Sequence, residues 1–446
     1  MIKNLLKVSC IFIVLSLSSP VFFLETGSLE KTDMGTETGI HLVDDHITVT
    51  IQRVREFLGT PFIIRVGIED SEIESDLYMD SEVFPNLTVT EGIMDPEGKI
   101  LVFIQLIDSV QRSIGYVELD FDMRTGDWTG SDFRGDADGY GHIVGESFEI
   151  WFDICVQDLD ADGLTTWEEL YIYRTDVLVD NRGDDKDEDG IPIEWEDHWG
   201  YDPFMKDNHD QLDPDNDGLT NLDEYRMNPW FSDPFRQDVF VEVDWMQGKY
   251  VWEKPYALPD EAKQMVMTAF ARHNIMLNID DGWMGGGEEI PFYGKDDLNL
   301  NTIYRKYFHD FLSDIWKQGI FHYAILMGAN PWREDIAGFN FQSDAFTVCV
   351  GTIRLFRLRE TARTLAIAGV FMHELGHNLG LFRSDFPGID NPDTRYPWKE
   401  DFWLYGPYHS CMNYRYTWHY VDYSPGTQGD YDFDDWGNLN LKHFLD

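Results

Sequence analysis

The stretch HELGHNLGLFR, residues 373 to 383, decides how the C-terminal half of the chain is interpreted. It places His373 and His377 four residues apart, with Glu374 between them. On a helix, side chains four apart project from one face, so both imidazoles can bind the same metal ion while the glutamate lies beside it. We therefore expect a helix that carries zinc, with Glu374 as the general base acting on water that the metal activates.

Residues further along the chain extend this pattern. Gly380 follows His377 by three positions and predicts a break in the helix, because glycine adopts backbone conformations that other residues avoid. About thirty residues later, SCMNYRY contains Met412 and Tyr414. An HExxHxxG helix followed by such a turn resembles the metzincin zinc endopeptidases. The resemblance implies that Met412 lies in a Met-turn beneath the zinc and that the Tyr414 phenol stabilises the oxyanion of peptide hydrolysis.

The third zinc ligand is the part of the metzincin pattern that this chain lacks. The family has His or Asp where Arg383 stands, and a guanidinium does not bind zinc. Because catalytic zinc needs three protein ligands plus water, we favour Asp385, two residues beyond, as the third ligand. Asp390, in the turn-rich PGIDNP, and His409, just before the Met-turn, are the alternatives; a glutamate ligand would have to be Glu400. With no third ligand the site would be weak or inactive.

Three acidic segments between residues 158 and 235 form an internal repeat with a period of 27 to 28 residues. DLDADGLTTWEE, DKDEDGIPIEWE and DPDNDGLTNLDE each carry acids at positions 1, 3 and 5, glycine at 6 and glutamate at 12. Calcium takes six to eight oxygen ligands, which this spacing supplies. The array resembles thrombospondin type 3 calcium repeats, which serve as extracellular spacers. The expected calcium ligands are Asp158, Asp160, Asp162, Glu169, Asp185, Asp187, Asp189, Glu196, Asp213, Asp215, Asp217 and Glu224.

The segment from about residue 40 to 157 alternates apolar and polar residues with a period of two. The runs HITVTIQRV, PFIIRVGIE, KILVFIQLID, IGYVELDFDM and SFEIWFDICVQ, separated by polar turns, predict an antiparallel β-sandwich. Within it, VELDFDMRTGDWTGSDFRG resembles the calcium-binding signature of C2 domains, which implies a loop-tip calcium site made by Asp120, Asp122, Asp127 and Asp132. An ordinary polar hairpin loop is the alternative.

Residues 236–446 have an α/β pattern. QDVFVEVDWM predicts a strand, DEAKQMVMTAFARHN a helix, IMLNIDDG a strand, TIYRKYFHDFLSDIWKQ a helix and GIFHYAILMG a strand, before the long helix TARTLAIAGVFMHELGHNLGL. The expected fold is thus multidomain: an N-terminal antiparallel β-sandwich, a calcium-repeat spacer and a C-terminal α+β (α/β) metzincin-like domain.

Composition limits the partners of the chain. Its 446 residues include 34 Lys and Arg against 82 Asp and Glu, a formal charge of -48 that repels nucleic acid and anionic membranes and favours cations. Residues 1–24, with Lys3 and Lys7 before an apolar run, predict a signal peptide; an uncleaved N-terminal membrane anchor is the alternative. Beyond it only Cys155, Cys349 and Cys411 remain, so at most one intramolecular disulfide can form.

Together these patterns predict a secreted or cell-surface zinc endopeptidase, stabilised by calcium, that hydrolyses protein or peptide substrates. The alternative is a calcium-dependent surface or adhesion protein with an inert protease-like domain. Glu374 favours the enzyme, because an inert domain has no physical need for a glutamate between the two histidines, whereas Arg383 favours the alternative.

Overall fold

The computed structural model describes most of the chain beyond the expected signal peptide. The described residues are 46–92, 99–122, 128–130, 140–156, 160, 162–294, 296–309, 317, 319–330, 333, 335–356 and 359–442. Residues Asp44–Asp446 form one compact unit. The expected calcium ligands Asp127, Asp132 and Asp158, and the side chain of Asp122, lie outside the described part.

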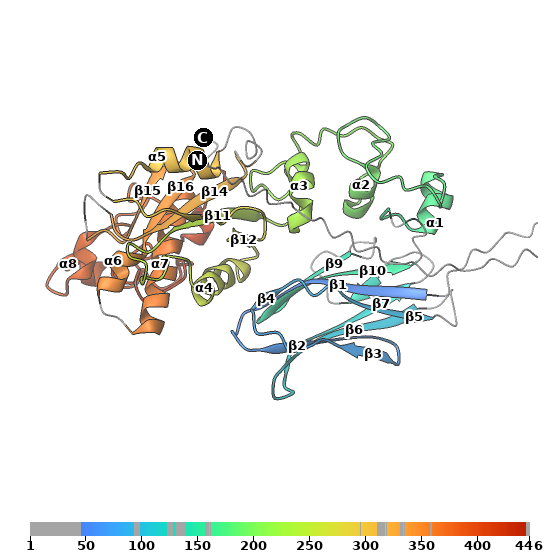
Figure 1. The fold of residues 1–446 in the computed structure, drawn as a ribbon, viewed down its shortest axis with the longest axis horizontal. Helices are drawn as coiled ribbons and strands as arrows, with labels where there is room; N and C mark the ends of the chain where they lie inside the picture. The colour runs from blue at the N-terminus through green and yellow to red at the C-terminus, as the bar shows by residue number, and fades with distance from the viewer. Residues whose placement is uncertain are drawn as a thin grey trace, which may run out of the picture. The chain divides into compact units, whose positions relative to one another are not determined.

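The N-terminal part is a sandwich of two five-stranded sheets whose strand pairs are antiparallel (Figure 1). One sheet contains β1 (His46–Glu56), β4 (Glu82–Val83), β5 (Leu87–Gly92), β9 (Tyr140–Val144) and β10 (Phe148–Val156); the other contains β2 (Phe62–Ile68), β3 (Ser71–Glu74), β6 (Lys99–Asp108), β7 (Ser113–Asp122) and β8 (Trp128–Gly130). Alternate residues of both sheets form a single apolar core. The predicted β-sandwich is confirmed, and its five expected strands correspond to β1, β2, β6, β7 and β10.

Each acidic loop of the repeat region is followed by a short helix. These helices are α1 (Thr166–Glu168), which continues as the turn η1 (Glu169–Tyr173), α2 (Ile193–Trp199) and α3 (Asn221–Met227), followed by η2 (Asn228–Trp230). The loop glycines Gly163, Gly190 and Gly218 have nearly identical φ angles of +105°, +104° and +105°. Side chains with a Cβ rarely adopt this conformation, which explains why glycine recurs at loop position 6.

The C-terminal part is built on a mostly parallel sheet in the order β12-β11-β14-β16-β15 (Figure 1). β11 (Asp238–Met246), β12 (Met276–Asp280), β14 (Phe321–Met327) and β16 (Ala345–Cys349) are parallel, β15 (Gly338–Gln342) is the antiparallel edge, and the short β13 (Glu289–Ile290) also pairs with β11. Helices α4 (Asp260–Ala271), α6 (Val350–Leu355) and α7 (Glu360–Asn378) pack against this sheet or one another. All seven residues of β14 are buried, as expected for a central parallel strand.

Most expected elements of this part are present, and two differ. The helix expected from Thr302 is described only as α5 (Leu300–Ile303) and the turn η3 (Tyr304–Phe308). The edge pair β15 and β16 was not expected, because GFNFQ is half-exposed and AFTVC is too short to be distinguished from a buried helical turn. Three short elements follow α7: η5 (Pro392–Arg395), α8 (Glu400–Leu404) and η6 (Trp436–Asn438).

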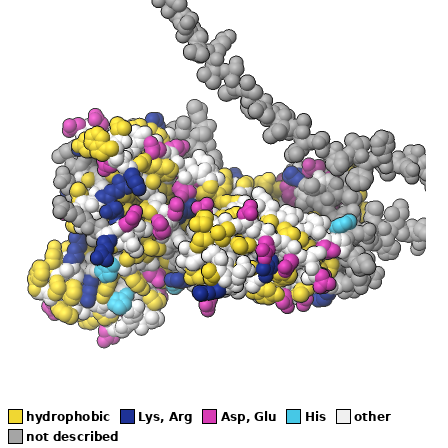
Figure 2. All heavy atoms as spheres, turned by 60° about the horizontal axis from the view of Figure 1, so that its bottom comes forward, with side chains coloured by type: hydrophobic (Ala, Val, Ile, Leu, Met, Phe, Trp, Pro, Cys, Tyr) yellow, Lys and Arg dark blue, Asp and Glu magenta, His cyan; other side chains and the backbone are white. Residues whose placement is uncertain are grey.

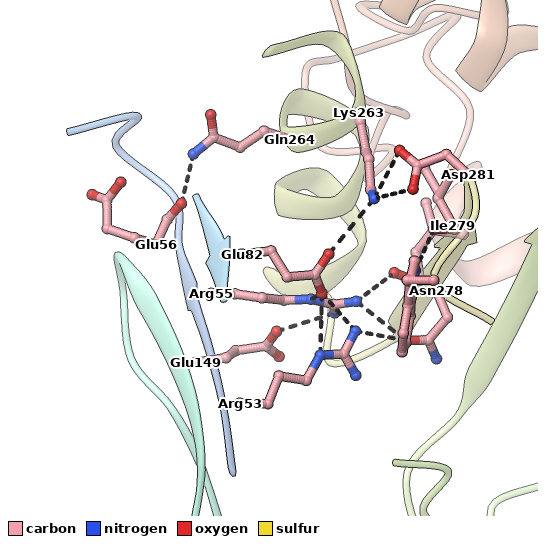
Figure 3. A network of polar contacts seen from close by, with 12 residues as sticks. Arg53, Arg55, Glu56, Glu82, Glu149, Lys263, Gln264, Asn278, Ile279 and Asp281 are labelled. Atoms are coloured by element: carbon pink, nitrogen blue, oxygen red, sulfur yellow. Dashed lines mark hydrogen bonds and ion pairs between the residues drawn. The ribbon is translucent and has the colours of Figure 1, made fainter. Parts of the chain in front are cut away.

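Two buried arginines on β1 join the sandwich to the C-terminal sheet (Figure 3). Arg53 Nη2 donates to Glu82 Oε1 at 2.7 Å and to Asn278 Oδ1 at 3.1 Å, and Arg55 Nη2 donates to the same Asn278 oxygen at 3.1 Å. The Arg53 guanidinium carbon also lies 4.6 Å from the Trp151 ring centre and 4.9 Å from that of Trp283. Buried charges that are paired in this way fix the two parts against each other, since separating them leaves a desolvated charge without its partner.

Charged and apolar side chains are mixed on the surface of the molecule that Figure 2 shows. Both acidic and basic side chains lie among the apolar ones on this face. Cys349 and Cys411 are free thiols. Within the described ranges, the helices are too short or too polar to cross a membrane.

Candidate metal centre

Helix α7 brings the two histidines together on one buried face. The ring centres of His373 and His377 lie 4.8 Å apart. The helix packs closely on the C-terminal segment at Gly369, where a Cβ atom would lie 2.0 Å from the Thr417 carbonyl oxygen. It ends where the sequence predicted, because Gly380 has a φ angle of +85° that other residues rarely adopt.

Each histidine is oriented by a hydrogen bond from its inner ring nitrogen. His373 Nδ1 lies 2.9 Å from the Cys411 carbonyl oxygen, and His377 Nδ1 lies 2.7 Å from the Leu381 carbonyl oxygen. A carbonyl oxygen only accepts, so each Nδ1 must carry the proton that it donates. In the neutral ring, Nε2 is then left with a lone pair, which is the arrangement that a zinc ligand requires.

Asp390 completes a group of three side chains with these histidines. His373 Nε2 lies 3.0 Å from Asp390 Oδ1, and His377 Nε2 lies 3.2 Å from Asp390 Oδ2. The Asp390 backbone has a left-handed φ of +53° and its N–H donates to the Met412 carbonyl oxygen at 3.2 Å. A non-glycine residue in this conformation is uncommon and often marks a functional site.

The favoured third ligand, Asp385, is placed elsewhere. Its side chain is exposed, and its Oδ2 accepts a hydrogen bond from the Phe382 N–H at 2.8 Å, which closes the turn after the helix. His409 and Glu400 also lie apart from the group, because the His409 ring packs on Tyr416 at 4.8 Å and Glu400 is exposed at the start of α8. The structure thus groups Asp390, one of the two alternatives, with the histidines and places Asp385 apart from them.

The loop between the end of α7 and residue 390 is wider than the sequence predicted, because apolar residues within it pack into a small core. Phe386 packs against Tyr405 and Phe433, with ring centres 5.4 Å and 5.2 Å away, and Ile389 is fully buried. Because Phe386 and Ile389 are packed in this way, the chain returns to the histidine helix only at residue 390. Arg383 and Asp385 lie on the exposed side of the loop.

The charges of this group fit a divalent cation. Burial alone would raise the pKa of Asp390, but hydrogen bonding to both histidines lowers it far below its usual range. Burial alone would lower the pKa of His373, yet Asp390 outweighs that effect and raises it to about 9. In protein without metal, a proton on His373 thus holds this imidazole and the Asp390 carboxylate together. The atom separations also match the roughly 3.3 Å between ligands that tetrahedral zinc sets through its 2.0–2.1 Å bonds.

Glu374 is buried beside the histidines and is supported by the edge strand β15. With its amide turned to satisfy both of its polar atoms, Asn340 donates to Glu374 Oε2 at 2.9 Å and accepts from Asn378 Nδ2 at 3.0 Å. A Cβ atom on Gly338 would lie 2.6 Å from Glu374 Oε1, so the strand can approach this closely only because glycine stands there. Burial raises the pKa of Glu374, as suits a group that exchanges a proton near neutral pH.

The predicted turn around Met412 lies under the helix. Met412 is fully buried, and a Cβ atom on Gly376 would lie 2.7 Å from its Sδ. Tyr414, two residues on, stacks on His373 with ring centres 5.5 Å apart, and the Arg395 guanidinium carbon lies 4.2 Å from the Tyr414 ring centre. Cys411 and Met412 accept hydrogen bonds from His373 and Asp390, so one short segment positions two members of the group.

Each acidic loop brings three of its predicted ligands together. Asp160, Asp162 and Glu169 form one group, Asp185, Asp187 and Asp189 a second, and Asp213, Asp215 and Asp217 a third, each with oxygens within 4.8 Å of one another. Burial and neighbouring acids raise the pKa of Asp215 to about 9 and that of Glu196 to about 8. Carboxylates held this close without a counter-ion repel, which favours a bound cation.

The position-5 aspartate of each loop links that loop to the next segment. Its outer oxygen accepts a backbone N–H from residue 181, 207 or 238 in the three loops, at 2.9, 3.0 and 2.7 Å. The third link joins Asp217 to Asp238, the first residue of β11, and Asp238 Oδ1 accepts from Asn278. The third loop is thus tied directly to the sheet that carries the histidine helix.

Several residues of these sites could not be found in the sequence. Asn340 and Gly338 lie in an edge strand without a motif, and Arg53 lies in an ordinary alternating strand. His209, discussed below, lies between two repeats and carries no spacing signal.

The similar solved structures named here each cover about a quarter of this chain. No protein-family model matches, and a search of curated proteins finds no match. A structure of C2 domains A and B of extended synaptotagmin 2 is 14% identical, over 25% of this chain and 38% of that chain, with a TM-score of 0.20. Its calcium-bound form is 13% identical, over 25% of this chain and 42% of that one, with a TM-score of 0.20. A C2 domain-containing protein is 12% identical, over 25% and 88%, with a TM-score of 0.19.

This chain spans less than half of the two synaptotagmin structures, and the low TM-scores carry no functional conclusion. The resemblance to C2 domains stays a prediction.

Proposed function

We propose that the chain is a zinc-dependent endopeptidase, with His373, His377 and Asp390 as its metal ligands. One observation carries the proposal: the two Nε2 atoms and the Asp390 carboxylate converge at 3.0 and 3.2 Å, while both Nδ1 atoms are committed to carbonyl oxygens. Nε2 atoms directed at a carboxylate need a proton or a metal ion between them, and two imidazoles with one carboxylate are a common ligand set of catalytic zinc.

The remaining residues have roles that follow from their positions. A bound zinc ion would supply Lewis acidity toward water and the substrate carbonyl. Glu374 accepts the proton of the attacking water and delivers it to the leaving amine. The Tyr414 phenol, stacked against His373, donates a hydrogen bond to the oxygen that becomes negative when the peptide carbonyl is attacked. Substrates are proteins or peptides.

Calcium is the second proposed cofactor and has a structural role. Bound calcium would neutralise the acidic loops. Asp217 then holds its hydrogen bonds to Leu219 and Asp238, which fixes the third loop against the first strand of the catalytic part. Export through the predicted signal peptide would bring the chain to the calcium-rich extracellular space.

Proteolysis by a Glu374→Gln variant tests the proposal. Glutamine keeps the size of the side chain but cannot accept the proton, so we expect digestion of a denatured protein substrate to fall by about 10²–10⁴-fold while zinc remains bound. Glu400→Gln, an exposed glutamate in the same part of the chain, is the matched control and should leave activity unchanged. Wild-type protein that holds zinc and calcium but digests nothing would contradict the proposal and support the inert surface protein.

A further inference from the structure

The second acidic loop differs from the first and third in the side chain that faces its last ligand. Glu196, at loop position 12, is fully buried, and its Oε1 lies 3.6 Å from His209 Nε2. Asp189 Oδ2, from loop position 5, lies 3.2 Å from the same nitrogen. His209 itself is 1% exposed, so this imidazole is held inside the repeat region rather than at its surface.

In the described part of the first and third loops, a different kind of side chain stands at the corresponding place. In the first loop, the Asn181 amide donates to Glu169 Oε1 at 3.4 Å. In the third loop, the Ser232 hydroxyl donates to Glu224 Oε2. The grouped ligand atoms of these two loops are oxygens, which suits calcium.

The atoms around His209 lack the hydrogen bonds that buried polar atoms normally form. His209 Nε2 and both carboxylate oxygens of Glu196 are buried and make no hydrogen bond to the residues that the structure describes. His209 Nε2, Asp189 and Glu196 nevertheless offer three ligand atoms within 4.8 Å of one another. Buried polar atoms without partners cost free energy, so this arrangement calls for an additional group at its centre.

The second ring nitrogen of His209 can carry the proton. His209 Nδ1 lies 3.0 Å from the Asn221 side-chain amide, whose Oδ1 is buried and has no hydrogen-bond partner among the described residues. Turning this amide by a half-rotation places Oδ1 on Nδ1–H. His209 then has the protonation pattern of His373 and His377, with an Nε2 lone pair directed at two carboxylates.

We propose that the second repeat binds a transition-metal ion of the zinc type through Asp189, Glu196 and His209, and so differs from the all-oxygen sites of its neighbours. Imidazole nitrogen is a preferred ligand of zinc and a poor one for calcium. The ion uses Glu196, the residue that a calcium ion held by Asp185, Asp187 and Asp189 would need as its bidentate ligand. Zinc and calcium therefore compete for the second repeat.

Metal content of the full-length chain tests this proposal. In the Asp390→Ala background, which removes a ligand of the proposed catalytic zinc, we expect one zinc ion to remain per chain after dialysis against zinc. Adding His209→Ala should remove that ion, whereas adding His419→Ala, a substitution of an exposed histidine, should not. Millimolar calcium should displace it. Zinc-free Asp390→Ala protein, or zinc retained when His209 is also replaced, would overturn the proposal.

Cobalt provides a second readout that does not depend on whether the His209→Ala variant folds. Co²⁺ added to Asp390→Ala protein should give the visible absorption of a tetrahedral site with nitrogen and oxygen ligands. Asn221→Asp, whose carboxylate can only accept from Nδ1–H, should retain this band and tighten binding by about 10-fold. Loss of the band in Asn221→Asp protein with an unchanged circular dichroism spectrum would show that Nδ1 accepts and Nε2 is no ligand.

Discussion

Calcium-free protein should lose stability as the pH rises from 5 to 7, in contrast to most acidic proteins. Burial is the main cause that raises the pKa of Asp217 to about 7 and that of Asp215 to about 9, from an ordinary value near 3.8. Between pH 5 and 7 the folded state therefore holds protons that the unfolded state has released. Because the folded state binds more protons, the free energy of unfolding falls with increasing pH in this window.

The size of the effect follows from the number of protons retained. For each proton that the folded state retains and the unfolded state releases, the free energy of unfolding falls by about 1.4 kcal/mol per pH unit above the pKa of the unfolded state. Asp215 and Asp217 are neighbours, so counting a single proton for the pair gives a loss of about 3 kcal/mol between pH 5 and 7. Bound calcium replaces the protons, so the loss should largely disappear when calcium is present.

Urea unfolding followed by tryptophan fluorescence would measure this loss. Protein stripped of metal and resupplied with zinc alone is compared at pH 5, 6 and 7 with protein that also holds calcium. Glu242 and Asp244, whose pKa values burial raises to about 8, contribute the same slope in both samples, so the difference between samples isolates the loops. Asp217→Asn should reduce that difference, and Asp430→Asn, an exposed control, should not. An equal change in stability from pH 5 to 7 in the samples with and without calcium would show that the loops retain no protons on folding.

Three further substitutions have clear expected outcomes. In millimolar calcium, which empties the second repeat of zinc, Asp390→Ala should weaken zinc binding at His373 and His377 more than about 100-fold in a competition assay with a chelating dye, because a ligand is lost. Asp385→Ala should leave zinc binding unchanged, and the reverse order would contradict the assignment. Tyr414→Phe should lower kcat for peptide hydrolysis by about 10²–10³-fold with zinc retained, and an unchanged kcat would remove the phenol from the reaction. Arg53→Met should lower the free energy of unfolding in urea by about 3–5 kcal/mol, since it leaves buried acceptors unpaired. Arg65→Met, which removes an exposed pair, should lower it by less than about 1 kcal/mol. Equal losses would be inconsistent with a structural role for the buried contact.

Elements with a strong local pattern could be predicted from the sequence. The strands of the sandwich alternate strictly, and α7 combines an apolar face with Gly380 at its end, so local chemistry was sufficient for both. The acidic loops could also be predicted from the sequence, because loop position 6 requires a glycine with positive φ whatever surrounds it.

Contacts set by packing at a distance could not be predicted. Asp385 was favoured because it is nearer in sequence to His377, but Phe386 and Ile389 bury themselves and bring Asp390 back instead. Asn340 reaches Glu374 only because β15 pairs with β16 at the sheet edge, a pairing that the sequence of β15 does not reveal. Likewise, His209 meets Glu196 through folding of one repeat on the next.

A single zinc ion shared by His373, His377 and Asp390 is the feature on which the proposed function depends. Anomalous X-ray scattering at the zinc edge, from crystals of the full-length protein grown with zinc, tests it most directly. We predict a peak bonded to both Nε2 atoms and to an oxygen of Asp390, at about 2.0–2.2 Å from each. Zinc-replete crystals with no peak at these three side chains, or with a peak whose third ligand is Asp385 or His409, would contradict it.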